Sequence, residues 1–443
     1  MSSPTVSIDE LIDRQDVRRT LLWVLVWAGA AMIADGYDLL SIAFVGPPIM
    51  KEWGLTNQDF ATVLIVSAAA AMLGGAACGY LADRIGRKPA IVVGTLILGL
   101  STLGSVFATN LGELIVWRAI ASFGIGTVPP VAIVVVNEFA PQRLRATIVA
   151  ALYLGTTIGV LLAGLVARSL VPEHGWQIMF LIGGIAPLIV CVGLLFFLQE
   201  SPRFLATRRP DSLALMRIAQ RLAPHASFAP GTRFLTAIAI SARGVPLALL
   251  FKDGRWATTV LFWVGYFASG LTLYTMLNWS PIILKTLGLS AGDAAVVAAW
   301  ASVTGWLGGV IITRLMDRFG LRAMILPPLI GIPLIAGLGY LAGAPEASIV
   351  VVSLLGGMAF SGGQAGMHAT GALIYPTAVR ANGVGLGLLV TRFAGVVAPK
   401  ITGILFTSDR AVTLVLWAAA LPLLIVSACY IGLARLNTRA TLT

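Results

Sequence analysis

Long apolar runs alternate with short polar segments along the whole chain. A helix needs about 20 apolar residues to cross a bilayer core about 30 Å thick. The runs lie at 20–49, 60–80, 89–110, 114–137, 147–167, 176–198, 257–284, 293–313, 323–343, 347–374, 381–406 and 411–434. A membrane β-barrel would instead show shorter stretches of alternating hydrophobicity. The pattern therefore predicts an all-α polytopic membrane protein with twelve transmembrane helices.

The composition supports a membrane protein. Of the 443 residues, 58% are hydrophobic and 11% are charged, and the mean hydropathy is +0.92. A soluble globular domain carries about 25% charged residues. The net charge of +11 does not indicate a nucleic-acid partner, because the basic residues sit between apolar runs. Cys78, Cys191 and Cys429 fall singly in different runs, so we expect no disulfide, no metal and no cofactor.

The basic residues also predict an orientation. Of the 30 Lys and Arg residues, 23 fall in alternate polar segments that include both chain ends. Five fall in the other segments: Lys51, Arg168, Lys285, Lys400 and Arg410. Cytoplasmic loops carry an excess of Lys and Arg, so we expect a multi-pass protein of the cell inner membrane with both termini in the cytoplasm.

One long polar stretch, 199–256, divides the twelve runs into six and six. We therefore predict an N-terminal bundle at 1–198, a cytoplasmic linker at 199–256 and a C-terminal bundle at 257–443. Four apolar residues lie near helical spacing within the linker: Leu213, Met216, Ile218 and Leu222. An interfacial membrane helix and a solvated linker with some helix both fit that spacing.

The two halves of the chain repeat. "YLADRIGRKPAI" (80–91) resembles "RLMDRFGLRAMI" (314–325), and "APQRLRA" (140–146) resembles "YPTAVRA" (375–381). Matching residues are 234 residues apart in the first pair and 235 apart in the second. Parallel six-helix repeats are typical of rocking transporters, whose binding site lies at the interface between the repeats.

Four charged residues lie inside the apolar runs: Asp35, Asp38, Arg118 and Arg392. None has a charged counterpart in the other repeat, so they indicate function rather than architecture. Asp35 and Asp38 share a helix face. Burial and mutual repulsion disfavour two ionised carboxylates there, so we predict that both serve proton coupling. Structural ion pairs remain an alternative for the two arginines.

The rise of a helix allows the depths of the charged residues in the membrane to be compared. At 1.5 Å per residue, Asp35 and Arg118 lie at the same level, and Arg392 lies nearer the midplane. We therefore expect Arg118 to pair with Asp35, and Arg392 to hold an anionic substrate by a bidentate charge-assisted bond. The reverse roles for the two arginines remain open.

Uncharged polar residues add candidates for the substrate site. These are Tyr266, Tyr274 and Asn278 in the seventh run, and Gln364 and His368 in the tenth. A hydrogen bond near the helix end is an alternative role for His368. Trp279 lies near a run end, where it is expected to anchor the helix at the membrane interface.

Charge clusters beside the repeated loops predict a gate. Asp83, Arg84 and Arg87 form one cluster, and Glu138 with Arg143 and Arg145 forms a second. Asp317 and Arg380 occupy the matching positions of the second repeat. Such pairs can hold two helices together in one state and release them in another.

The whole chain resembles the major facilitator superfamily, in its six-plus-six helices and in the loop motif from Gly79 to Lys88. "DGYDL" in the first helix resembles the DGxD signature of the aromatic acid:proton symporters, and "ESPRFL" and "YPTAVRANGVG" fit the same group. The resemblance implies transport roles for these residues: Asp35, Asp38, Arg118, Glu138, Arg380 and Arg392. Ser122, Leu321 and His368 depart from the usual pattern, which leaves the exact substrate open.

These observations lead to a functional hypothesis. We expect a monomeric, proton-coupled symporter that imports a small aromatic carboxylate, benzoate-like or hydroxybenzoate-like, by alternating access. A symporter for a muconate-like or aliphatic acid and a drug or metabolite:proton antiporter remain alternatives. A receptor or membrane enzyme is disfavoured, because the sequence shows no nucleophile–base pair, metal-ligand cluster or nucleotide motif.

Overall fold

The computed structural model describes residues 5–15, 19–224, 226, 228–229, 232–236, 247–252, 255–406 and 411–440, and Arg410 lies outside them. The helices are α1 (Ile8–Arg14), α2 (Arg19–Trp53), α3 (Asn57–Ile85), α4 (Arg87–Gly104), α5 (Leu111–Phe139), α6 (Arg145–Ser169), α7 (Val171–His174), α8 (Gln177–Phe197), α9 (Pro202–Arg208), α10 (Leu213–Leu222), α11 (Trp256–Thr286), α12 (Ala291–Phe319), α13 (Leu326–Leu338), α14 (Glu346–Ile374), α15 (Thr377–Leu405), α16 (Ala411–Ala420) and α17 (Pro422–Ala440). Short 3-10 helices are η1 (Ser105–Phe107), η2 (Gln142–Leu144), η4 (Leu247–Leu250) and η5 (Gly320–Ile325), and the strands are β1 (Thr5–Ser7) and β2 (Arg233–Leu235).

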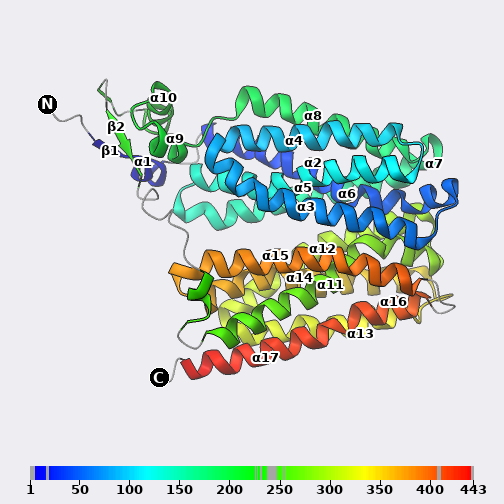
Figure 1. Cartoon of the computed structure of the whole chain (residues 1–443). Coiled ribbons are helices and arrows are strands. Elements are labelled where there is room, and N and C mark those ends of the chain that lie inside the picture. Colours follow the sequence, from blue (N-terminus) through cyan, green and yellow to red (C-terminus); the bar gives the residue numbers. More distant parts are fainter. Residues whose placement is uncertain are drawn as a thin grey trace.

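The long helices form two bundles (Figure 1). The N-bundle contains α2 to α8, and the C-bundle contains α11 to α17. Between the bundles, α3 packs against α15 and α6 packs against α12. The all-helical architecture predicted from hydropathy is therefore confirmed.

The number of crossings differs slightly from the predicted twelve. By length and composition, the described residues contain eleven candidate membrane spans, and the longest, Ala291–Leu338, runs through both α12 and α13. Gly320, at a φ of +60°, ends α12. Helix α13 has 13 residues, a rise of about 20 Å, which is shorter than the bilayer core. Counting α12 and α13 as separate crossings would give twelve.

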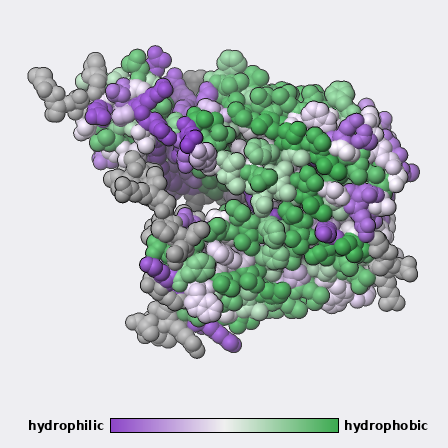
Figure 2. All heavy atoms as spheres, in the orientation of Figure 1, coloured by the Kyte–Doolittle hydropathy of each residue, from purple (hydrophilic) through white to green (hydrophobic). Residues whose placement is uncertain are grey.

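An apolar belt crosses the face of the bundles that Figure 2 shows. In Figure 2 hydrophobic residues cover the middle of the visible face, and polar residues gather toward its two ends. Large apolar side chains such as Phe196 and Ile189 are exposed on this belt. Such a wide apolar surface is stable against lipid but not against water.

The repeated loops have matching local structures. Gly86 ends α3 and Gly320 ends α12, both at positive φ, where a glycine is favoured. The guanidinium of Arg145 donates to the Ala140 carbonyl, and that of Arg380 donates to the Tyr375 carbonyl. These contacts occupy equivalent positions, which explains why Gly and Arg recur in both halves.

A small cap, formed by β1, α1, α9, α10 and β2, covers one end of the N-bundle (Figure 1). We call the end of the molecule that carries this cap the cap face. Strands β1 and β2 pair in parallel, and α10 buries Leu215, Ile218 and Leu222. This apolar side of α10 packs within the cap, against α1 and α9, an arrangement that favours the solvated-linker prediction.

The bundles meet at the end opposite the cap face. Trp279 of α11 packs edge-on against Phe60 of α3, with ring centroids 6.3 Å apart. Arg168 of α6 pairs with Asp293 of α12 at 3.2 Å. Trp279 is fully buried, so its predicted role as an interfacial anchor is wrong. Its run continues as helix to Thr286, which places the indole between the bundles rather than at a helix end.

Candidate functional site: a charged cavity between the bundles

A cavity of about 250 Å³ lies where the two bundles face each other. Its charged and polar lining consists of Asp35, Ser67, Arg118, Ser122, Tyr153, Thr156, Tyr274, Asn278 and Arg392. Apolar side chains including Met32, Leu39 and Ile125 complete the wall. Three of the four charged residues that the sequence places inside apolar runs thus share one cavity. Two of the predicted polar substrate residues, Tyr274 and Asn278, line it as well.

Arg118 pairs with Asp38, not with Asp35. Its Nη1 and Nη2 donate to Asp38 Oδ1 and Oδ2, each at 2.9 Å, and Thr102 Oγ1 donates to Oδ1 at 3.0 Å. The side chains of Arg118 and Asp38 are 1% and 0% exposed. The predicted pairing of Arg118 with Asp35 is therefore wrong.

Gly36 explains how the two aspartates come to lie in different surroundings. A Cβ at Gly36 would overlap the backbone of Thr156, so only glycine permits α6 to approach α2 this closely. Gly159, on α6, meets the backbone of Ile33 in the same way. This contact fixes the rotation of α2, so that Asp38 faces α4 and α5 while Asp35 faces the cavity.

Asp35 has no partner for its Oδ1 atom among the described residues, although the side chain is buried. Ser67 Oγ and Thr156 Oγ1 line the same cavity and are also buried without a hydrogen bond in that part of the chain. Buried polar atoms are rarely left unpaired in native proteins. Three such atoms around one cavity indicate a polar occupant.

Arg392 enters the cavity from the C-bundle. Its Nη1 donates to the Ala71 carbonyl of α3 at 2.7 Å, so this hydrogen bond joins the two bundles. Among the described residues, no carboxylate forms a salt bridge with Arg392, and Asp35 lines the same cavity. Arg392 is therefore available to an anion.

Sequence reasoning missed Tyr153, Ser67 and Thr156. Tyr153 lies on α6 and lines the same cavity as Asp35 and Arg392. Isolated hydroxyl residues in apolar helices are common, because they can bond to the preceding turn. Only the absence of such bonds at Ser67 and Thr156 distinguishes them, and the sequence does not show it.

Three predicted substrate residues lie away from the lining of this cavity. Tyr266 Oη and His368 Nδ1 are 3.1 Å apart, which matches the alternative role considered for His368. Gln364 is buried, and both polar atoms of its amide lack a partner within the described residues. Substrate contact by these three residues stays a prediction.

Three of the predicted gate residues, Asp83, Arg87 and Glu138, form one cluster. Arg87 bridges Asp83 at 3.0 Å and Glu138 at 3.2 Å. The backbone amides of Arg87 and Lys88 donate to Glu200 at the start of the linker. Glu138 thus pairs with Arg87 rather than with Arg145, because the turn at Gly86 brings Arg87, the first residue of α4, next to α5.

The remaining gate candidates are less connected. Arg84 stacks on the Tyr80 ring, 4.3 Å from its centroid. Asp317 is exposed and forms no salt bridge among the described residues. Leu321 occupies the position that corresponds to Arg87 and is buried. Within the described chain, the charged cluster is therefore confined to the N-bundle.

Replacing Glu138 with glutamine should lower the maximal transport rate about fivefold or more, since coupling energies of this kind are about 1–3 kcal/mol. Apparent affinity should change little, because Glu138 lies outside the cavity lining. Asp83→Asn should have a smaller effect, since Asp83 is 73% exposed and exposed pairs contribute little. Initial-rate uptake over a range of substrate concentrations measures both parameters, and a loss of affinity alone would refute the gating role.

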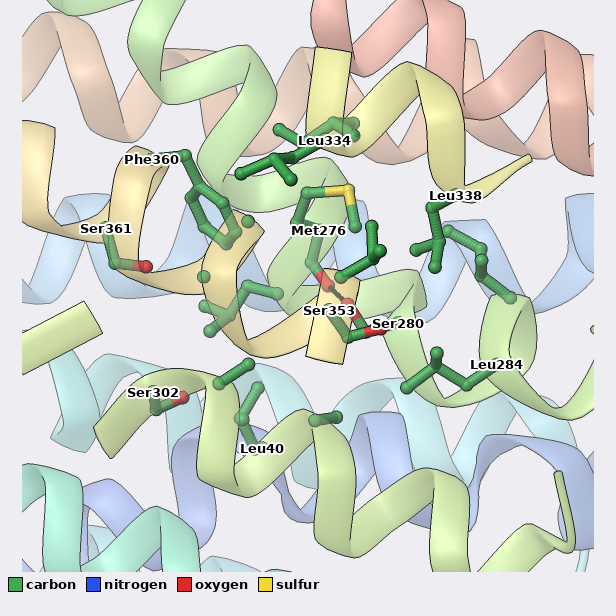
Figure 3. A pocket seen from close by; sticks show the side chains of 18 residues that line it. Leu40, Met276, Ser280, Leu284, Ser302, Leu334, Leu338, Ser353, Phe360 and Ser361 are labelled. Atoms are coloured by element: carbon green, nitrogen blue, oxygen red, sulfur yellow. Dashed lines mark hydrogen bonds between the residues drawn. The ribbon is translucent and has the colours of Figure 1, made fainter. Parts of the chain in front are cut away.

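A second cavity, of about 40 Å³, lies between α11, α12, α13 and α14 (Figure 3). The hydroxyls of Ser280 and Ser353 on its wall donate to carbonyls of their own helices. No charged residue lines it, and its volume suits one or two waters. It therefore lacks both the space and the charge to hold an organic anion.

Among the described residues, no cluster of His, Cys, Asp and Glu could hold a metal ion.

Comparison with known proteins adds independent findings. The model of the Major Facilitator Superfamily matches residues 26–399. The chain is 30% identical over 397 residues to a 4-hydroxybenzoate transporter of Pseudomonas aeruginosa, with 87% of each chain covered. It is 28% identical over 438 residues to a gallate transporter of Pseudomonas putida, with 98% of this chain and 97% of the relative covered.

Solved structures agree in fold. A bacterial homologue of the human lysosomal transporter Spinster, in an inward-facing and occupied conformation, aligns with a TM-score of 0.72 at 17% identity, covering 95% of this chain and 98% of that one. The xylose transporter of E. coli, partially occluded and inward open, aligns with a TM-score of 0.71 at 16% identity, covering 93% and 97%.

Proposed function

Because this chain belongs to the Major Facilitator Superfamily, and within it to the aromatic acid:proton symporters, we propose that it imports a small aromatic carboxylate together with protons. The members of this superfamily are transporters rather than enzymes. The chain is a multi-pass membrane protein, and we place it in the bacterial inner membrane.

One observation carries the proposal. Asp35 of the N-bundle and Arg392 of the C-bundle line the same cavity, and within the described chain neither has an ion-pair partner. Arg118 lines the cavity too, but Asp38 already neutralises it. The site therefore offers one available cation for one carboxylate, and one available carboxylate for one proton.

This arrangement suggests how proton and substrate are coupled. When Asp35 is ionised, it attracts Arg392 and competes with a substrate carboxylate for the guanidinium. When Asp35 is protonated, that competition ends, and Arg392 can bind the substrate by a charge-assisted pair of hydrogen bonds. Substrate and proton therefore occupy the site together, as symport requires. Since the two residues lie on different bundles, occupancy also alters the force between the bundles.

The surroundings favour a ring that carries one carboxylate. Leu39, Ile125 and the ring of Tyr274 offer apolar and aromatic contact, and the relatives are named for 4-hydroxybenzoate, gallate and benzoate. The unpaired hydroxyls of Ser67 and Thr156 could bond to a ring hydroxyl. A muconate-like dicarboxylate would need a second free cation, which the lining lacks because Arg118 is engaged by Asp38.

Counterflow in proteoliposomes tests the substrate class. Vesicles loaded with unlabelled benzoate, 4-hydroxybenzoate, muconate or an aliphatic acid of similar size are diluted into labelled benzoate. We expect the two aromatic acids to drive accumulation of label, and the other two to drive little. Equal counterflow with the aliphatic acid would contradict recognition of the ring.

Replacing Arg392 with lysine should weaken substrate binding by about 1.5–3 kcal/mol, the scale of a hydrogen bond to a charged group. Lysine keeps the charge but lacks the planar fork of arginine. Isothermal titration of the purified protein with benzoate measures the change. Lys285→Arg, on the opposite face and away from the cavity, serves as the control. Unchanged binding by the Arg392 variant would remove Arg392 from the site.

We also propose that the cap face is cytoplasmic, on the basis of the excess of Lys and Arg there. Reporter fusions at Gln220 in the linker and after Thr443 should then report a cytoplasmic location. A fusion in the 286–290 turn, between α11 and α12, should report the outside. An external location for the linker would reverse the orientation.

A further inference from the structure

Helix α3 carries two adjacent glycines, Gly74 and Gly75, that contact different neighbours. A Cβ at Gly74 would overlap the Phe123 backbone of α5, so Gly74 allows two helices of the N-bundle to pack closely. A Cβ at Gly75 would instead overlap the tip of Arg392, with the Cζ atom 2.9 Å away. The guanidinium of the C-bundle thus rests directly on the bare backbone of α3.

The turn of α3 under this guanidinium runs from Ala71 to Gly75. The Ala71 carbonyl accepts the Arg392 hydrogen bond at 2.7 Å. Gly126 of α5 packs closely against the same turn, where a Cβ would overlap the Ala71 carbonyl. The turn is therefore packed against α5 of its own bundle and also accepts a hydrogen bond from Arg392 of the other.

We propose that this turn, Ala71–Gly75, is a seat for Arg392, and that Gly75 is a positioning residue for substrate binding. The inference deepens the proposed function and rests on it. The seat takes one N–H of Arg392, which has five. The others remain available to a carboxylate in the cavity. A guanidinium fixed in advance loses less conformational entropy when it binds.

Gly75→Ala should displace Arg392 from the seat without disturbing the fold. The methyl group would meet only the tip of a flexible side chain, so Arg392 can swing away while the α3 backbone stays in place. The displaced guanidinium would enter the cavity, where Asp35 competes for it. Gly337→Ala in α13 is the matched control, because a Cβ at Gly337 has no neighbour within 4 Å.

The first experiment is isothermal titration of both full-length alanine variants with benzoate. Gly75→Ala should bind benzoate about tenfold more weakly than the unmutated protein, and Gly337→Ala should bind equally well. Equal affinity in Gly75→Ala would overturn the positioning role.

The second experiment needs no ligand. Thermal unfolding is measured for Gly75→Ala, Arg392→Gln and the double variant. Since both substitutions remove the same contact between the bundles, the double variant should melt no lower than Arg392→Gln alone. If the losses in melting temperature of the two single variants add in the double variant, Gly75 acts independently of Arg392. That result would overturn the proposal that the turn is a seat for Arg392.

The two experiments distinguish two kinds of failure. If the unmutated protein binds no benzoate, the proposed function fails, and with it the role of Gly75 in binding. The unfolding cycle still decides whether Arg392 rests on the turn. If benzoate binds and the cycle is additive, the function survives and the seat is excluded.

Discussion

Replacing Arg118 with methionine should destabilise the protein by about 3–5 kcal/mol, because Asp38 would remain as an unpaired carboxylate in the interior. The two residues form a bidentate pair at 2.9 Å and are almost fully buried. Thr102 adds a third hydrogen bond to the same carboxylate. This pair joins α2, α4 and α5, so its loss should loosen the N-bundle as a whole.

The matched control removes both charges. A protein with Asp38→Leu and Arg118→Met leaves no buried charge unpaired, and such replacements are often neutral or stabilising. It should recover most of the stability that Arg118→Met loses. Thermal unfolding of the purified variants measures this. If Arg118→Met melts like the unmutated protein, the Asp38–Arg118 pair is not the structural element described above.

Replacing Asp35 with asparagine should abolish proton-driven accumulation of substrate while leaving the protein folded. Asparagine has the same shape but carries no exchangeable acidic proton. Asp35 forms no salt bridge among the described residues, so its loss should cost little stability. The competition for Arg392 would also end, and exchange of substrate across the membrane should therefore continue.

Two measurements on the same proteoliposomes separate these outcomes. Uptake driven by a pH gradient should fall to the equilibrium level in Asp35→Asn, while counterflow should persist. Asp211→Asn, in the exposed linker, is the control and should retain both activities. Accumulation against a gradient by Asp35→Asn would show that another group carries the proton.

The sequence predicted the helices and the important charges, because both depend on hydropathy along the chain. Functional roles were predicted for the isolated charges inside apolar runs, and three of them, Asp35, Arg118 and Arg392, line one cavity. The partners of these charges were not predicted correctly. Depth along a helix is known to about one turn, and Asp35 and Asp38 differ by less than a turn. Rotation of α2 chooses between them, and that rotation is set by the contact of Gly36 with α6.

Contacts between separate helices were harder to predict. The position of Trp279 near a run end suggested a membrane anchor, yet its indole fills the space beside Phe60 and Phe406. Arg87 was expected to bind within its own loop and also reaches Glu138 on another helix. Both depend on how separate segments meet, which neither periodicity nor charge counting shows.

Uptake of radiolabelled 4-hydroxybenzoate by proteoliposomes under an imposed pH gradient tests the central claim most directly. With the interior alkaline, the labelled acid should rise well above its external concentration, and a protonophore should abolish that rise. Protein-free liposomes must be subtracted, since weak acids also cross lipid alone. If the gradient of that sign drives no uptake, or if an acidic interior does so instead, proton-coupled import is contradicted.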